Sequence, residues 1–222
     1  GVLVALQSRI NADLSQQVGA GVLGAAISFG TGLLLLIAIV VARADYRQAA
    51  AGIPRLVRDG RLRSWQLLGG LGGAWLVTTQ GVVVSVVGVT TFTIGVVAGQ
   101  VSGSLLVDRY GLSPAGQMAV TANRGFAAVV ALVAVVFSGM HGGQFGLSIV
   151  VLLAVSAGFG ISVQQAINAQ VAVATRQPLA ATLVNFIVGC AGLFTVSGIA
   201  LASGAVTFEG WPPQWWLYLG GP

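Results

Sequence analysis

Residues 6–13 read LQSRINAD and place amide groups and two opposite charges inside an otherwise apolar segment. The stretch returns in the second half of the chain, where residues 163–170 read VQQAINAQ. The glutamine, isoleucine, asparagine and alanine of the first stretch recur in the second with the same spacing. Polar groups are costly in lipid, so a repeated polar patch at membrane depth predicts a pathway that is lined by both halves of the fold.

The composition indicates an integral membrane protein. Only 7% of the 222 residues are charged, 56% are hydrophobic and the mean hydropathy is +0.92. A typical soluble domain has about 25% charged residues. The chain has one cysteine and one histidine, which leaves little material for a metal site or for hydrolytic chemistry. We therefore expect no cofactor and no metal site.

Membrane-spanning runs can be placed along the whole chain. A spanning helix needs about 20 mostly apolar residues, and about seven such runs are present. They cover approximately residues 1–15, 18–42, 65–87, 89–107, 114–137, 147–174 and 177–203. The first run is short and the last residues resemble the start of an eighth span, so we expect both ends to be truncated. Every proline is expected in a loop or at the start of a helix, which leaves no span broken by proline.

The distribution of arginine predicts the orientation. The net charge is +5, and the ten basic residues are all arginine. Most lie in loops that the predicted spans place on one side of the membrane: Arg43, Arg47, Arg55, Arg58, Arg61, Arg63, Arg109 and Arg176. By the positive-inside rule this side is cytoplasmic. We interpret these arginines as topology determinants, and we expect no nucleic-acid partner.

The sequence repeat extends beyond the polar patch. Residues 65–70, WQLLGG, match residues 216–221, WLYLGG, in their tryptophan, second leucine and both glycines. Residues 29–32 match residues 186–189 in their phenylalanine and last glycine. The repeat unit contains five spans, and because five is odd, the second copy must enter the membrane in the opposite direction. Inverted repeats of this kind are found in many secondary transporters.

Short motifs along the chain support a family resemblance. They are QxxINxxL at 7–14, GGxGG at 69–73, VAGQ at 97–100, DxxG at 108–111, QQxIN at 164–168 and NF at 185–186. Together they resemble the drug/metabolite transporter superfamily in its YdcZ-like branch of bacterial inner-membrane transporters. The resemblance implies small-molecule transport by an all-α transmembrane bundle with an inverted five-plus-five helix repeat. The first repeat would cover residues 1–139, and 140–222 would begin the second, truncated repeat, giving about seven to eight spans.

The repeated amides are the first candidates for the substrate pathway. Gln7 and Asn11 share one helix face, as do Gln164 and Asn168, because each pair is four residues apart. Amides both donate and accept hydrogen bonds, which suits contact with a polar solute. The alternative is that they join neighbouring helices, where each contributes about 1 kcal/mol.

Further pathway candidates lie inside predicted spans: Trp75, Gln80, Gln100, Asn123, Arg124 and Asn185. For the amides the alternative is packing between helices. Arg124 is either an anchor that extends to the membrane interface or a cation that lines the cavity and holds an anionic group. Trp75 either forms a cavity wall or faces lipid or the core.

Arg9 and Asp13 lie four residues apart and can form an ion pair on one helix face. They are either a structural pair or part of a gate that responds to protons, since ionisable groups in the membrane are candidates for function. Asp13 is the only acid inside a predicted span and is the candidate for proton coupling.

Three glycines form a stripe on the fourth predicted span, namely Gly95, Gly99 and Gly103. Such a stripe allows another helix to approach closely. The partner is either a helix of the same bundle or a second copy of the chain, in which case the stripe is a homodimer seam.

No catalytic constellation is evident in the sequence. The single histidine, His141, has no acid near it, and no phosphate-binding loop is present, which argues against an enzyme and against an ATPase. We therefore expect a secondary transporter, in the export direction, for small polar or amphipathic metabolites across the cytoplasmic membrane by alternating access. The alternative is a membrane scaffold whose polar residues only stabilise helix packing.

Overall fold

The computed structural model describes residues 2–140 and 145–221, and the predicted all-α class is confirmed over this part of the chain, which contains no strand. The helices are α1 (Val2–Gln17), α2 (Gly21–Ala42), α3 (Ala44–Arg58), α4 (Gly70–Tyr110), α5 (Ala122–Met140), α6 (Phe145–Thr175) and α7 (Pro178–Ala202). Two short 3-10 helices, η1 (Ser64–Leu67) and η2 (Trp215–Gly220), precede α4 and end the described chain. His141 lies outside the described residues.

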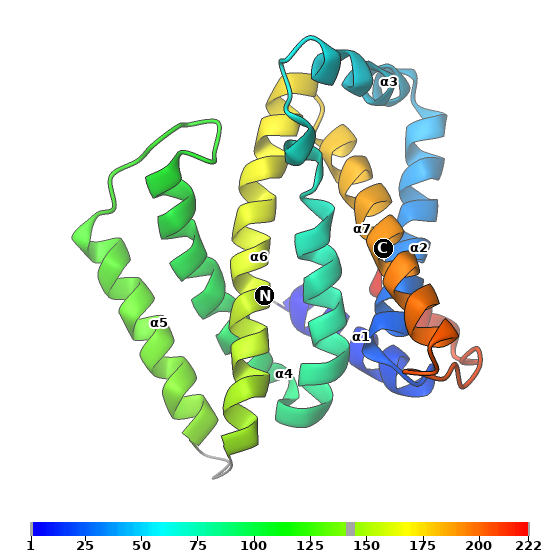
Figure 1. Cartoon of the computed structure of the whole chain (residues 1–222), viewed down its shortest axis with the longest axis vertical. Coiled ribbons are helices and arrows are strands. Elements are labelled where there is room, and N and C mark those ends of the chain that lie inside the picture. Colours follow the sequence, from blue (N-terminus) through cyan, green and yellow to red (C-terminus); the bar gives the residue numbers. More distant parts are fainter. Residues whose placement is uncertain (1, 141–144, 222) are drawn as a thin grey trace.

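Within the described residues, four helical segments are long and apolar enough to cross a membrane: Gly21–Ala42, Ser64–Tyr110, Ile149–Thr175 and Pro178–Ala202. The second of them consists of η1 and α4, and α4 bends sharply at Gly88, where φ is 81° and ψ is 165°. A left-handed φ of this kind favours glycine, which has no Cβ. The bend lies between the two predicted runs 65–87 and 89–107. Figure 1 shows the two arms of α4 leaving this bend toward the same end of the molecule.

The arginine-rich loops lie together at one end. Figure 1 shows α3, the loop after α4 and the junction of α6 with α7 at the top, opposite the bend in α4. We call this the Arg-rich end, and it carries Arg47, Arg61, Arg109 and Arg176. The opposite end carries the α1–α2 junction and the loop after α7.

Helix α3 was predicted as a loop, and the expectation that every proline lies in a loop or at a helix start is wrong at Pro54, which lies inside this helix. Tyr46, Ala50 and Val57 form an apolar face on α3 and pack on residues of α2, α6 and α7. This packing outweighs the backbone hydrogen bond that Pro54 removes, because most helical stability in proteins comes from burial of such a face.

The fifth predicted span begins later than expected. It was placed from residue 114, but α5 begins at Ala122. Gly111 caps the C-terminus of α4 with a left-handed φ of 64°. The following loop folds back on α4, and the N–H of Met118 donates to the carbonyl of Asp108 at 2.9 Å. This return of the chain uses residues that would otherwise extend α5.

The glycine stripe packs on α6 of the same chain. A Cβ at Gly99 would lie 2.0 Å from the backbone oxygen of Val155, and a Cβ at Gly103 would lie 2.1 Å from Oγ of Ser162. A Cβ at Gly95 would lie 2.7 Å from the Cβ of Ala154. The partner in this structure is therefore a helix of the same bundle, and a dimer through this stripe would require α6 to move away.

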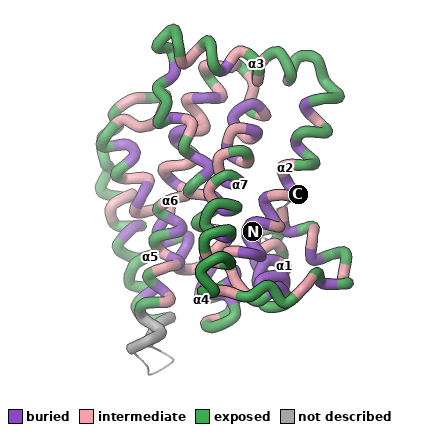
Figure 2. Tube along the Cα trace, turned by 45° about the vertical axis from the view of Figure 1, so that its right-hand side comes forward, coloured by how far each residue is buried: buried purple, intermediate pink, exposed green. Residues whose placement is uncertain are grey.

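Apolar side chains cover the outer faces of the bundle. In Figure 2 the buried residues follow the inner faces of the helices, while exposed residues follow their outer faces and α3. Phe126 on α5 is 71% exposed, and Ile149 on α6 and Phe194 on α7 are also exposed. Exposed apolar surface of this extent fits contact with lipid.

Candidate functional site

The amides of the first half form a buried network that joins three helices. Asn11 on α1 is fully buried, and its Nδ2 donates to Oε1 of Gln80 on α4 at 2.7 Å. Its Oδ1 accepts a hydrogen bond from Oγ of Ser28 on α2 at 2.9 Å. Nε2 of Gln80 donates to Oγ of Ser8 at 3.0 Å. Both Nδ2 and Oδ1 of Asn11 therefore form hydrogen bonds to neighbouring helices, which fits a role in holding helices together.

Helix η2 closes this network from the end of the described chain. Nε2 of Gln7 donates to the carbonyl of Gly220 at 2.9 Å. A Cβ at Gly220 would lie 2.1 Å from Oδ1 of Asn11, so only glycine fits there without displacing the amide.

The amides of the second half converge on the start of α4. A Cβ at Gly69 would lie 2.8 Å from Oδ1 of Asn168 on α6 and 2.8 Å from Oδ1 of Asn185 on α7. Oε1 of Gln164 faces the next turn, 3.0 Å from the place of a Cβ at Gly73. The oxygens of Gln164 and Asn185 are buried without a hydrogen-bond partner. A buried acceptor without a partner costs free energy, so these two oxygens retain a capacity to accept a hydrogen bond from a solute or water.

Helices α2 and α7 meet through residues that match in the sequence repeat. The rings of Phe29 and Phe186 stack with centroids 5.0 Å apart. A Cβ at Gly32 would lie 2.3 Å from the ring of Phe186, and a Cβ at Gly189 would lie 2.4 Å from the ring of Phe29. The packing of Gly32 on Phe186 is thus repeated by the packing of Gly189 on Phe29.

The same reciprocity continues at the glycine pairs of the repeat. A Cβ at Gly70 would lie 2.1 Å from the backbone oxygen of Asn185, and one at Gly221 would lie 1.7 Å from the backbone oxygen of Ser28. Gly70 and Gly221 match in the sequence repeat, and Ser28 and Asn185 occupy equivalent positions just before Phe29 and Phe186. The backbones therefore touch at equivalent places on both sides of the Phe29–Phe186 stack.

A family model described as "Putative inner membrane exporter, YdcZ" matches residues 1–137 and 149–222. The chain belongs to the YdcZ family of inner membrane exporters. The YdcZ-like branch expected from the motifs is confirmed, and so is an inner-membrane, multi-pass location. The searches of curated proteins and of solved structures found no match. Membership in a family of exporters supports a transport role, and it favours neither an enzymatic role nor the alternative of a membrane scaffold.

The two opposite charges of α1 form an exposed ion pair in this YdcZ-family chain. Nε of Arg9 lies 3.1 Å from Oδ2 of Asp13, and the two side chains are 67% and 34% exposed. The pair lies on the outer face of α1, away from the buried face that carries Asn11.

A second ion pair joins α4 to α5 and was missed by sequence reasoning. Nη2 of Arg124 lies 2.5 Å from Oδ2 of Asp108, which is buried. Asp108 lies just beyond the predicted run 89–107, but it is inside the candidate span Ser64–Tyr110. The expectation that Asp13 is the only acid inside a span is therefore wrong. The sequence contained a signal for this ion pair, because Asp108 and Arg124 carry opposite charges and flank the same loop at the Arg-rich end.

The remaining pathway candidates of this exporter lie apart from Asn11. Nε1 of Trp75 donates to Oγ of Ser156 on α6 at 2.9 Å, and the Trp75 side chain is 42% exposed. Gln100 is half-buried on the second arm of α4, and Asn123 is exposed at the start of α5. The structure thus separates the predicted residues into the network around Asn11, the group around Gly69 and isolated positions.

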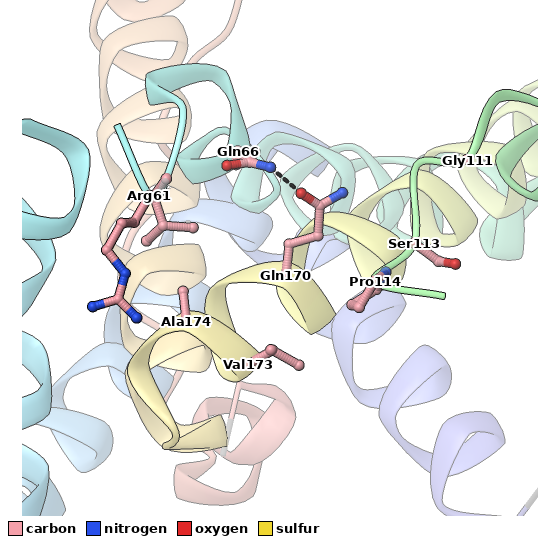
Figure 3. Close-up of a pocket in the computed structure, with 9 residues that line it drawn as sticks. Arg61, Gln66, Gly111, Ser113, Pro114, Gln170, Val173 and Ala174 are labelled. Atoms are coloured by element: carbon pink, nitrogen blue, oxygen red, sulfur yellow. Dashed lines mark hydrogen bonds between the residues drawn. The ribbon is translucent and has the colours of Figure 1, made fainter. Parts of the chain in front are cut away.

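A cavity that the sequence did not suggest opens at the Arg-rich end, with a volume of about 470 Å³. It lies between the α3–η1 loop, η1, the end of α6 and the loop after α4, and its polar lining is Arg61, Gln66, Ser113 and Gln170 (Figure 3). No group of three or more His, Cys, Asp or Glu residues that could hold a metal occurs among residues 2–140 and 145–221.

Proposed function

We propose that this chain is a secondary transporter that exports small polar or amphipathic metabolites by alternating access of two inverted halves. The reciprocal contact of α2 with α7, centred on Phe29 and Phe186, carries the proposal. Two copies of one unit that run in opposite directions would meet in this way, with equivalent residues on each side of the stack. In this proposal residues 1–139 form the first unit and residues 140–222 begin the second.

The Arg-rich end would face the cytoplasm. The positive-inside rule places arginine-rich loops on that side, and Figure 1 supports the assignment because these loops lie at one end of the bundle. In this orientation a solute enters at the Arg-rich end and leaves at the end that carries the bend of α4.

The substrate pathway would follow the amides of the second half. Gln164 and Asn185 each have a buried oxygen without a partner, and Asn168 is only half-buried. The network around Asn11 would serve as the fixed support against which these residues move.

Gln164→Ala and Asn168→Ala are expected to reduce export strongly while the protein remains folded, since each removes an amide that the solute would contact. Inside-out membrane vesicles carrying the full chain are tested with labelled amino acids, carboxylates, amines and sugars. The solute that accumulates is then used for the variants. Gln165→Ala is the matched control, because Gln165 is the adjacent amide of the same helix and is exposed.

Equal losses in Gln164→Ala and Gln165→Ala would contradict the pathway. If no solute accumulates beyond vesicles without the chain, although the protein is folded, the transport function itself is wrong.

Asp13 is the proposed carrier of a coupling proton, with Arg9 holding its carboxylate when the proton leaves. Asp13→Asn is then expected to remove the dependence of export on an imposed pH gradient, while export down a solute gradient continues. Asp108→Asn is the comparison. Because Asp108 forms an ion pair with Arg124, this substitution is expected to lower stability and to leave the dependence on the pH gradient in place. An unchanged response to the pH gradient in Asp13→Asn rules out coupling through this residue.

A further inference from the structure

The cavity at the Arg-rich end is a candidate binding site in its own right. Its walls come from the loop between α3 and η1, from η1 itself, from the end of α6 and from the loop after α4, and no acidic side chain lines it. We propose that it binds the carboxylate or phosphate group of a small soluble anion, as the site where the exporter receives its substrate. The role of this anion as a substrate rests on the proposed function, whereas the binding of the anion does not.

A chain of hydrogen bonds fixes the orientation of the two amides in this wall. The backbone N–H of Arg63 donates to Oε1 of Gln66 at 2.6 Å. Nε2 of Gln66 donates to Oε1 of Gln170, and Nε2 of Gln170 donates to the carbonyl of Leu112. A backbone N–H can only donate and a backbone carbonyl can only accept, so the two ends of the chain exclude a flip of either amide.

This fixed orientation gives the cavity a donor-rich wall. The oxygens of Gln66 and Gln170 are both occupied by donors, while each amide nitrogen has a second hydrogen that the chain does not use. Ser113 adds a hydroxyl and Arg61 adds a guanidinium. A wall with several donors, a positive charge and no carboxylate complements an oxyanion.

Arg61 supplies the charge because no acid in the described part of the chain pairs with it. At the Arg-rich end, Asp45 pairs with Arg43 and Asp108 pairs with Arg124, while Asp59, two residues before Arg61, is exposed and does not line the cavity. The surrounding loops carry further arginines, and a cleft lined by one sign of charge raises the local concentration of ions of the opposite sign.

The alternative is that Arg61 only helps to set the orientation of the chain in the membrane, as the other arginines of this stretch do. The structure separates the two roles, because Arg58 and Arg63 belong to the same stretch but do not line the cavity. Figure 3 shows Arg61 on one side of the cavity, the Gln66–Gln170 pair in the middle, and Ser113 and Pro114 on the other side.

The cavity also joins the two halves of the fold. Gln66 and Ser113 belong to the first sequence unit, and Gln170 belongs to the second. A ligand held by both would contact parts of the molecule that alternating access separates. Its affinity would therefore depend on the conformation that the exporter adopts.

The test measures binding to the full chain in dodecyl maltoside, without anionic lipid and at constant ionic strength with chloride as the balancing ion. Succinate and inorganic phosphate are the probes, and glycerol and tetramethylammonium are the neutral and cationic comparisons. We expect succinate or phosphate to raise the midpoint of thermal unfolding in a saturable way. Arg61→Gln is expected to weaken that affinity about tenfold, because it removes a charge-assisted hydrogen bond.

Arg58→Gln is the matched control and is expected to leave the affinity unchanged. Gln170→Leu breaks the amide chain and is expected to weaken binding as well, with its own unfolding midpoint showing that it folds. The absence of saturable binding by both anions, or equal losses in Arg58→Gln and Arg61→Gln, would overturn the proposal.

A second arm separates a soluble anion from a lipid headgroup. The same titration is repeated in nanodiscs of phosphatidylcholine with and without phosphatidylglycerol. If only phosphatidylglycerol stabilises the protein and Arg61→Gln removes that effect, the site binds a lipid and the proposal is wrong. Anion binding that depends on Arg61, in a chain that moves no solute, supports the site and contradicts the transport function.

Discussion

Gly99→Ala is expected to disrupt the contact between the second arm of α4 and α6 and to lower the amount of folded protein strongly. The added Cβ would lie 2.0 Å from the backbone oxygen of Val155, which no side-chain rearrangement can relieve. The helices would have to separate along their whole contact, whereas overpacking in an ordinary core costs about 1–3 kcal/mol. The fraction of monodisperse protein in detergent and its midpoint of thermal unfolding measure the effect.

Gly158→Ala tests the same contact from the other side, since its Cβ would lie 2.0 Å from the backbone oxygen of Val96. Gly198→Ala on α7 is the matched control, because no atom lies within 4 Å of its added Cβ. In a helix this change is expected to be neutral or to stabilise by up to about 1 kcal/mol. Similar behaviour of all three variants would show that α4 and α6 do not approach as described.

The apolar runs predicted most of the helices because the signal for a membrane span is local. The bend at Gly88 fell between two predicted runs, and α7 begins at Pro178, where a proline in the first turn was expected. Helix α3 was missed because its apolar face is short and matters only once α2 and α7 supply a surface for it. The start of α5 was misplaced because the hydrogen bond from Met118 to Asp108 is a tertiary contact.

The polar residues of the site were identified from the sequence, but their partners were not. Gln7, Asn11 and Gln80 were chosen because amides are rare in apolar spans, yet the sequence contains nothing that pairs Asn11 with Gln80. Gln170 was noticed only as the counterpart of Asp13, and Gln66 belonged to a segment read for its tryptophan. The cavity they line depends on how η1 meets α6, which is a property of the packed bundle.

Asn11→Ala is expected to destabilise the protein by about 1–3 kcal/mol, because it leaves Oε1 of Gln80 and Oγ of Ser28 buried without their partner. The free energy of unfolding in mixed micelles of increasing sodium dodecyl sulfate measures the loss. Thr195→Ala is the control, because Thr195 is an exposed polar residue that bonds only to the carbonyl of Ala191 in its own helix.

A double-mutant cycle shows whether the loss comes from the network itself. When Asn11→Ala is combined with Gln80→Leu, the cost of the unpaired Gln80 amide should disappear, because Oε1 of Gln80 is no longer left buried and unsatisfied, while the hydroxyl of Ser28 still lacks its partner. The two changes should therefore cost less together than the sum of their separate effects. Strict additivity would mean that the two amides do not support one another. Unchanged stability of Asn11→Ala together with loss of export would instead place Asn11 on the substrate pathway and remove it from the structural support of α1, α2 and α4.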